Sequence, residues 1–194
     1  MKHLKMIGLA AVAAMALMAF GVSSASATTL AITGVKQTGK VTIDATAEGS
    51  IKLEKTDHTF ANTCTESTVE GETTSFTSVG TAPIGGPITT LTFKKCTTES
   101  VVVDAPGSLS IEWIEGTSNG TVKSSNAKVT VPSPFGALTC ETGAGNDIGT
   151  LTGKSTGFAT MDIKAVLNCG FLAPSAIWEG SYNITEPHNL SVVS

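Results

Sequence analysis

The sequence predicts an all-β protein, a single-domain antiparallel β-sandwich or barrel, from its composition, its alternating apolar residues and its spaced turn residues. Threonine dominates after residue 27, and serine, glycine and valine are also common. β-Branched side chains favour the pleated surface of a strand and lose rotamer freedom in a helix. No segment after residue 27 has the apolar spacing of an amphipathic helix, so every expected element of the domain is a strand.

The strands are expected in a regular series along the chain, with turn residues between them. Apolar and polar residues alternate in Val41–Ala45, Ser50–Glu54, Ile88–Phe93, Leu109–Trp113, the stretch marked by Val122, Val129 and Val131, Ile148–Leu151, Phe158–Leu167 and Ile177–Thr185. Turns are expected at Glu48–Gly49, Gly85–Pro87, Pro106–Gly107, Ser118–Gly120, Pro132–Pro134 and Gly143–Asp147. Short strands at this spacing are typical of a sandwich or a barrel.

The N-terminal segment has the three parts of a cleavable signal peptide. Lys2 and Lys5 provide a positive start, residues 6–20 carry no charge, and the small residues Ala-Ser-Ala end at Ala27. We therefore expect a signal helix that is cleaved before Thr28. A retained transmembrane anchor is the alternative, but it needs about 20 apolar residues, more than this run contains.

The chain is thus expected to consist of a signal peptide, residues 1–27, and one secreted, extracellular domain, residues 28–194. Two of the 12 basic residues lie in the signal segment, which leaves ten lysines against 16 acidic residues and a formal charge of −6. The chain contains no arginine. Because nucleic-acid binding relies on clusters of Lys and Arg, this composition argues against a nucleic-acid partner, and no integral membrane association is expected.

Four cysteines lie in the expected domain, at positions 64, 96, 140 and 169. An even number of cysteines in an exported chain indicates disulfides, and the residues are too far apart for the close Cys pairs of a metal site. Three connectivities are possible. We expect Cys64–Cys96 and Cys140–Cys169, because bonds between neighbouring cysteines join adjacent β-ribbons.

Two glycine-rich segments resemble ligand-binding motifs without meeting their requirements. Gly149–Thr156 resembles a phosphate-binding loop, but three residues separate its glycines where that loop needs four. Gly143–Asp147 resembles one turn of a calcium-binding nonapeptide repeat, and a lone copy supplies only part of a coordination shell. We therefore expect turns at both places, and neither a cofactor nor a metal ion.

No residues form a recognisable catalytic motif, so we expect a protein without enzymatic activity. His58 and His188 lie in no nucleophile context. Paired carboxylates for glycoside hydrolysis are the alternative, with Glu112, Glu115 and Glu179 beside the two tryptophans. Adjacent residues face opposite sides of a strand, so carboxylates pointing away from buried tryptophans are the simpler interpretation.

Three segments, Gly107–Trp113, Gly149–Gly153 and Trp178–Thr185, resemble small exported proteins of soil actinobacteria. The whole design, with a signal peptide, spaced cysteines, Thr/Ser/Gly-rich strands and few charges, is more distantly similar to the PraB family, exported proteins described as activators of alkane oxidation. The resemblance implies an extracellular or surface helper that contacts hydrophobic material without chemistry of its own. It transfers no catalytic or binding residue to this chain.

The sequence therefore predicts a secreted, non-enzymatic binding or accessory module for hydrophobic or cell-surface material. Its partner is expected to be an extracellular or cell-surface ligand. Two alternatives stay open: an extracellular glycoside or ester hydrolase, and a structural matrix component that self-associates through strand edges.

Overall fold

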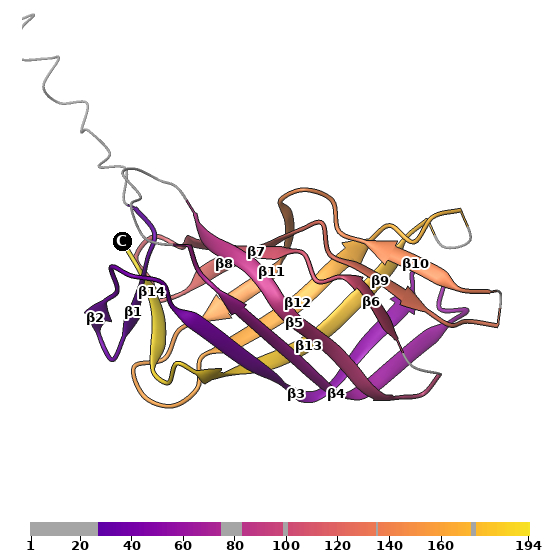
Figure 1. The fold of residues 1–194 in the computed structure, drawn as a ribbon, viewed down its shortest axis with the longest axis horizontal. Helices are drawn as coiled ribbons and strands as arrows, with labels where there is room; N and C mark the ends of the chain where they lie inside the picture. Colours follow the sequence, from indigo (N-terminus) through magenta and orange to yellow (C-terminus); the bar gives the residue numbers. More distant parts are fainter. Residues whose placement is uncertain (1–26, 75–82, 99–100, 135, 172–173) are drawn as a thin grey trace, which may run out of the picture.

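The computed structural model describes residues 27–74, 83–98, 101–134, 136–171 and 174–194, and every regular element within them is a β-strand. The all-β prediction is therefore confirmed. The expected signal helix lies outside the described residues, which begin at Ala27. Figure 1 shows an elongated barrel with a small three-stranded sheet at each end.

The central element is a closed antiparallel barrel of eight strands. Its residues alternate between the interior and the surface, most regularly along the strand from Thr160 to Leu167. Of the two predicted architectures, sandwich and barrel, the structure has the barrel. Its strands, in order around the barrel, are β3 (Thr42–Lys55), β4 (Ala61–Glu72), β5 (Ile84–Cys96), β7 (Ser108–Trp113), β8 (Gly120–Ser125), β11 (Asn146–Thr152), β12 (Thr160–Leu167) and β13 (Ala176–Glu186), which pairs with β3.

One end of the barrel is covered by the sheet of β1 (Thr29–Ile32), β2 (Val35–Lys36) and β14 (Leu190–Val193), in the order β14-β1-β2. Thr28, just before β1, is buried, and its Oγ1 accepts a hydrogen bond from the backbone N–H of Trp113 at 3.0 Å. The first and last strands of the described chain are thus tied to the barrel at this end.

The other end is covered by β6 (Val102–Ala105), β9 (Lys128–Val131) and β10 (Leu138–Glu141), a sheet that we call the lid. The strands of the lid lie in the order β6-β9-β10. In the chain β6 leads into β7, β8 leads into β9 and β10 leads into β11, and these three barrel strands lie in the matching order β7-β8-β11. The pairing register continues unchanged from β6/β9 (Ala105 opposite Lys128) to β7/β8 (Ser108 opposite Ser125), and it shifts by one residue from β9/β10 to β8/β11. The lid is therefore an extension of three barrel strands, each bent over the barrel end.

Special backbone conformations produce the bend. Gly107, between β6 and β7, has φ +74°, and a Cβ there would lie 2.5 Å from the Ser125 carbonyl oxygen and 2.6 Å from the Ala127 nitrogen. Asn126, between β8 and β9, also has positive φ. The Thr142 hydroxyl accepts a hydrogen bond from the Ala127 N–H at 3.0 Å and so supports the same joint. Only glycine tolerates both the φ angle and the close backbone contact at position 107.

At the lid end, the barrel becomes two facing layers, with the lid on one side and β12, β13, β3, β4 and β5 on the other. On one flank the Cys140–Cys169 disulfide joins β10 to the segment after β12, and Glu141 and Asn168 exchange two backbone hydrogen bonds. On the other flank, the described parts of β5 and β6 share no ladder pairing.

Two expectations about individual elements are wrong. Val41–Ala45 and Ser50–Glu54 were expected as separate strands with a turn at Glu48–Gly49, but Thr42–Ala45, Glu48–Gly49 and Ser50–Glu54 all lie in β3, whose register shifts between Thr46 and Ile51. Gly49, with φ +84°, lies in this irregularity, which lets one long strand bend around the barrel. Gly85–Pro87 was expected as a turn and instead lies within β5, between β4 and β7.

Candidate functional site

An apolar cavity, which we call the chamber, lies between the lid and the facing strands. It has a volume of about 40 Å³ and is partly open to solvent. None of the described residues that line it is ionisable. They are Ile51, Leu53, Asn62, Cys64, Leu91, Phe93, Val101, Ala127, Val129, Val131, Cys140, Thr142, Leu167 and Trp178.

Asn62 is the buried amide of the chamber, with 2% of its surface exposed. Its Oδ1 accepts hydrogen bonds from the Thr97 hydroxyl and the Thr98 backbone N–H, both at 3.2 Å. Because a backbone N–H can only donate, this contact places the amide oxygen, and not the nitrogen, toward Thr98. The Nδ2 group is buried and has no hydrogen-bond partner among the described residues.

Trp178 lies in the same row of residues as Asn62. Trp178 on β13 is opposite Leu53 on β3, and Leu53 is opposite Asn62 on β4. The indole packs edge-on against Phe93 of β5, with ring centroids 5.9 Å apart. Its Nε1–H is also buried without a partner in the described part of the chain. Two unpaired N–H donors thus belong to one apolar cavity.

Unpaired buried donors require an explanation, because leaving such a group without a partner costs about 1–3 kcal/mol. The other polar group of the chamber, the Thr142 hydroxyl, bonds to the Ala127 N–H and the Ser124 hydroxyl. The Nδ2 group of Asn62 and the Nε1–H of Trp178 are therefore the unsatisfied buried side-chain groups among the described residues that line the chamber.

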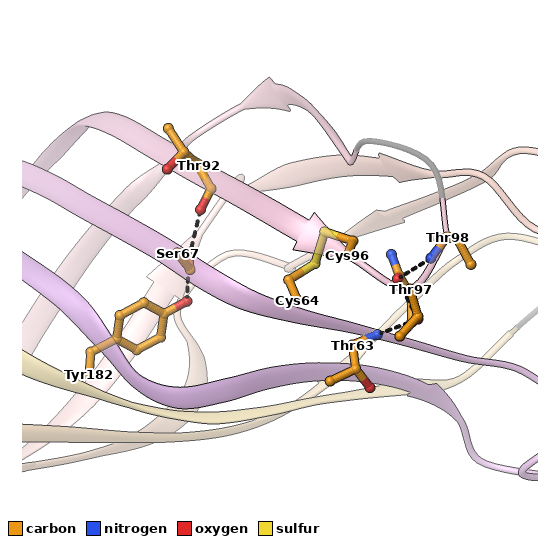
Figure 2. Close-up of a disulfide and its surroundings, with 9 residues drawn as sticks. Thr63, Cys64, Ser67, Thr92, Cys96, Thr97, Thr98 and Tyr182 are labelled. Atoms are coloured by element: carbon orange, nitrogen blue, oxygen red, sulfur yellow. Dashed lines mark hydrogen bonds between the residues drawn. A yellow bond between two sulfur atoms is a disulfide. The ribbon is translucent and has the colours of Figure 1, made fainter.

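Both disulfides lie at the chamber. The structure pairs Cys64 with Cys96 and Cys140 with Cys169, the connectivity favoured from the sequence. Figure 2 shows the first bond between β4 and β5, which are also paired by a ladder of hydrogen bonds. The second fastens the lid to the facing layer. Cross-links at these two places hold the walls of the chamber together.

A polar chain lies deeper in the barrel, as Figure 2 shows. The Ser67 hydroxyl donates to the Thr92 carbonyl oxygen at 2.7 Å, so the Tyr182 hydroxyl donates to Ser67 Oγ at 2.9 Å. Tyr182 is fully buried. Burial raises the pKa of its hydroxyl well above the usual value of 10.0, and the Ser67 hydrogen bond opposes this effect only in part. Tyr182 is therefore a structural donor and not a base.

Tyr182 is the single tyrosine of the chain, so its ionisation can be followed by absorbance. We expect no tyrosinate band in the folded protein as the pH rises through 10, because the folded-state pKa is raised. The contribution of the neutral Tyr182 hydroxyl to the free energy of unfolding is fully present below the unfolded-state pKa of about 10, and it decreases at higher pH. Far-UV circular dichroism in the same titration is the control. Reversible ionisation near pH 10 with the strands intact would contradict the burial of this hydroxyl.

Two further cavities lie inside the barrel. One of about 20 Å³ lies next to Tyr182, and one of about 60 Å³ lies toward the β14-β1-β2 sheet. Trp178 lines the 20 Å³ cavity as well as the chamber. Among the described residues that line the 60 Å³ cavity, no buried side-chain donor lacks a partner. The chamber is therefore the better candidate for a binding site.

The structure does not bring together Glu112 and Glu179, two of the carboxylates on which the hydrolase alternative depends. Glu112 lies on β7 with its Oε2 2.8 Å from Lys123 Nζ, and Glu179 lies on β13 with its Oε1 3.8 Å from Lys164 Nζ. These two strands are four positions apart in the eight-stranded barrel, on opposite sides of it. Glu115 is exposed in the turn after β7.

The two histidines lie in different loops. His58 is exposed in the turn between β3 and β4, with Nδ1 2.9 Å from Glu54 Oε1. His188 lies between β13 and β14 and packs against the ring of Phe158. The structure places neither histidine beside a nucleophile.

The two glycine-rich segments lie in and beside β11. In Gly143–Asp147 the chain turns into β11, and Asp147 Oδ1 accepts the Gly149 N–H at 3.2 Å. Gly149–Thr156 runs from β11 into the loop before β12. Within the described ranges, no three His, Cys, Asp or Glu side chains form a group that could hold a metal ion.

Comparisons with protein-family models, curated proteins and solved structures give no significant match. The described residues also contain no helix of the length and apolarity needed to cross a membrane. The chemistry of the chamber must therefore be inferred from its own residues.

Asn62 and Trp178 were not identified from the sequence as residues with unpaired N–H donors, although the position of Asn62 along the chain offers one indication. Asn62 precedes Cys64 by two residues on a strand, so both side chains face the same side. An asparagine that shares a face with a disulfide cysteine is a candidate buried amide. Trp178 was expected to be a buried core residue, and only the tertiary structure reveals its unpaired Nε1–H.

Proposed function

We propose that this chain is an exported binding protein that holds the end of a small apolar molecule in the chamber. The observation that carries the proposal is the chamber itself, a partly open cavity whose described lining is apolar apart from a few polar side-chain groups such as those of Asn62 and Thr142. Ligand sites are commonly apolar cavities with a few placed polar groups, and an eight-stranded barrel can hold one small ligand.

Export is supported by the signal-peptide pattern of residues 1–27 and by two disulfides, which persist in oxidising compartments. Binding is favoured over paired-carboxylate hydrolysis because Glu112 and Glu179 lie on opposite sides of the barrel.

The volume of the chamber limits what enters it. A volume of 40 Å³ exceeds the ~10–15 Å³ that one water molecule needs and is below the ~150 Å³ of a cavity that binds benzene. The chamber therefore accommodates the end of an apolar molecule, and the remainder extends through its open side.

The test uses the fluorescence of Trp178. Because the chain has two tryptophans, Trp113→Phe leaves Trp178 as the sole indole. We expect this variant to show a saturable change in emission, and a rise in Tm, with at least one of n-octane, 1-octanol, 2-octanone and toluene.

Trp178→Phe is the matched control, since its remaining Trp113 lies toward the β14-β1-β2 sheet and donates its Nε1–H to the Thr117 carbonyl oxygen at 2.8 Å. Its emission should not respond to the same probes. If no probe gives a saturable change in Trp178 emission below its solubility limit, the proposed function is wrong.

A further inference from the structure

We propose that the edge of β5 beside the lid binds an extended segment of another polypeptide, which pairs with β5 as an added strand and places alternate apolar side chains over the chamber. The inference goes beyond the proposed function, because the partner is a polypeptide of which only side chains enter the chamber.

One edge of β5 lacks a partner strand along its second half. On one side, β5 pairs with β4 almost to its end. On the other side, its ladder with β7 covers Ile84 to Pro87, and the Ile88 N–H then donates to the Gly107 carbonyl oxygen at 3.0 Å. Along residues 89–96, no described strand pairs with this second side. Every second backbone N–H and C=O group there is therefore offered to an added strand.

The neighbour across this edge is β6 of the lid, and we call the space between β5 and β6 the seam. Within the described chain β6 pairs with β9 on one side, and its other edge faces the seam without a ladder. Cα atoms of the paired strands β6 and β9 lie within 8 Å of each other along their ladder, whereas those of β5 and β6 do so at isolated points at most. One inserted strand needs about 10 Å between its two neighbours, twice the ordinary strand spacing. The seam is therefore suited to a strand and too wide for direct pairing of β5 with β6.

The edge of β5 is also unusually bare. Natural edge strands are commonly protected by proline, lysine or a bulge. Residues 89–93, Thr-Thr-Leu-Thr-Phe, contain neither proline nor charge. Protection begins only beyond them, with Pro87 on one side and with Lys94 and Lys95 on the other, where Lys95 has a φ of +52°. A stretch of about five residues is thus left open to a partner strand.

The inner face of this stretch determines the partner's side chains. Leu91 and Phe93 both line the chamber, whose described lining carries no ionisable group. On an antiparallel partner, the residues opposite them face the same side, so two positions separated by one residue lie over the chamber. Those positions need apolar side chains of modest size, such as valine, because the chamber has a volume of about 40 Å³. The residue between them faces outward beside Thr92 and can be polar.

The described strands of this chain do not supply the partner. All fourteen are already paired, in the barrel or in one of the two end sheets. A second copy would have to release one of these strands to fill the seam. A separate extended polypeptide, with backbone hydrogen bonds for affinity and alternate apolar side chains for specificity, meets the requirements of the seam without such a loss.

The test uses the capped peptide acetyl-Ser-Thr-Val-Thr-Val-Thr-Ser-amide and the Trp113→Phe protein with both disulfides intact. The matched control peptide, acetyl-Ser-Thr-Thr-Val-Val-Thr-Ser-amide, has the same composition, but its two valines face opposite sides of a strand. We expect the alternating peptide to bind several-fold more tightly in titration calorimetry and to change the emission of Trp178. The alternating peptide N-methylated at both valines and at the threonine between them should not bind, because it keeps the side chains and loses the backbone donors.

Hydrogen exchange locates the bound peptide. Amides of β5 after Ile88 and of β6 should exchange more slowly in the complex, since the added strand pairs with these edges. Amides of β12, which has partners on both sides, should be unchanged. Protection elsewhere with none at the seam would overturn the inference.

A pair of variants tests whether the peptide's side chains enter the chamber. Replacing both valines of the peptide with leucine should weaken binding several-fold, because the chamber is small. Leu91→Ala enlarges the chamber and should restore the affinity for the leucine peptide. Leu151→Ala is the matched control, because Leu151 is as well buried and lines the 60 Å³ cavity toward the other end of the barrel. Recovery of affinity in both variants, or in neither, would contradict entry of the side chains at Leu91.

The outcomes separate this inference from the proposed function. If n-octane or another apolar probe binds and no peptide does, the inference is wrong and the proposed function stands. Equal binding of the alternating and control peptides also overturns the inference. Dimerisation that protects the seam amides, without a response to peptides, would assign the seam to a second copy and overturn it as well. Peptide binding at the seam without binding of any small apolar probe would support the inference and contradict the proposed function.

Discussion

Removal of the Cys140–Cys169 disulfide by a double substitution with alanine is expected to lower the free energy of unfolding by about 3 kcal/mol and to abolish binding in the chamber. The stability loss follows from the 29-residue separation that the bond closes in the unfolded chain. The binding loss has a separate cause, because this bond fastens β10 of the lid to the segment after β12. Besides it, the described chain is joined at this flank by the two backbone hydrogen bonds between Glu141 and Asn168 and by the hydrogen bond from Asn146 Nδ2 to the Val166 carbonyl oxygen at 3.2 Å.

The matched control is the double alanine variant of Cys64 and Cys96. This bond spans 32 residues, so its loss should lower the free energy of unfolding by a similar amount, about 3 kcal/mol. It joins β4 and β5, which stay paired through their own ladder. We therefore expect chamber binding to be largely kept in this variant.

Denaturant unfolding and hydrogen exchange measure the two effects separately. Amides of β9 and β10 should exchange faster in the Cys140/Cys169 variant than in the Cys64/Cys96 variant, since only the first releases the lid. Equal exchange and equal ligand affinity in the two variants would show that the lid does not depend on its disulfide.

Gly86→Ala should lower the free energy of unfolding by about 3 kcal/mol. Gly86 lies in β5, where a Cβ would be 1.9 Å from the Glu72 carbonyl oxygen and 2.9 Å from its carbon. Both are backbone atoms of β4, so the contact cannot be relieved by a side-chain rotation. The strands would have to separate, which weakens the barrel at this point. Thermal and denaturant unfolding measure the loss.

Gly39→Ala is the control for the effect of removing a glycine. Gly39 is exposed before β3, its φ is not in the left-handed region, and a Cβ there has no neighbour within 4 Å. This substitution should change stability by less than about 1 kcal/mol, and in the stabilising direction, through the unfolded state. Similar losses in both variants would contradict the close backbone approach at Gly86.

Local patterns predicted the strands well where one face of the strand is buried. In β12, Met161, Ile163, Ala165 and Leu167 are buried and the residues between them are exposed, so the period of two is visible in the sequence. The same reasoning failed at Gly85–Pro87. Glycine and proline indicate a turn by local preference, whereas in the folded chain Gly85 and Gly86 permit close approach of the neighbouring backbones.

The chamber could not be predicted in this way because its components are distant in the sequence. Asn62 and Trp178 are neighbours only through Leu53, and their row exists only once β13 pairs with β3 and β3 with β4. The lid likewise depends on the bend at Gly107 and Asn126, which the turn expected at Pro106–Gly107 only partly anticipated.

By itself, the sequence determined the all-β class and the number of disulfides, and it led us to favour the pairing of cysteines that the structure contains. These features depend on the spacing of apolar residues and cysteines along the chain. Only the tertiary structure decided that the strands close into a barrel, that three of them bend into a lid, and that two buried N–H donors lack partners in the described part of the chain. The physical reason is that hydrogen-bond satisfaction depends on every neighbour of a buried group, and those neighbours come from strands far apart in the chain.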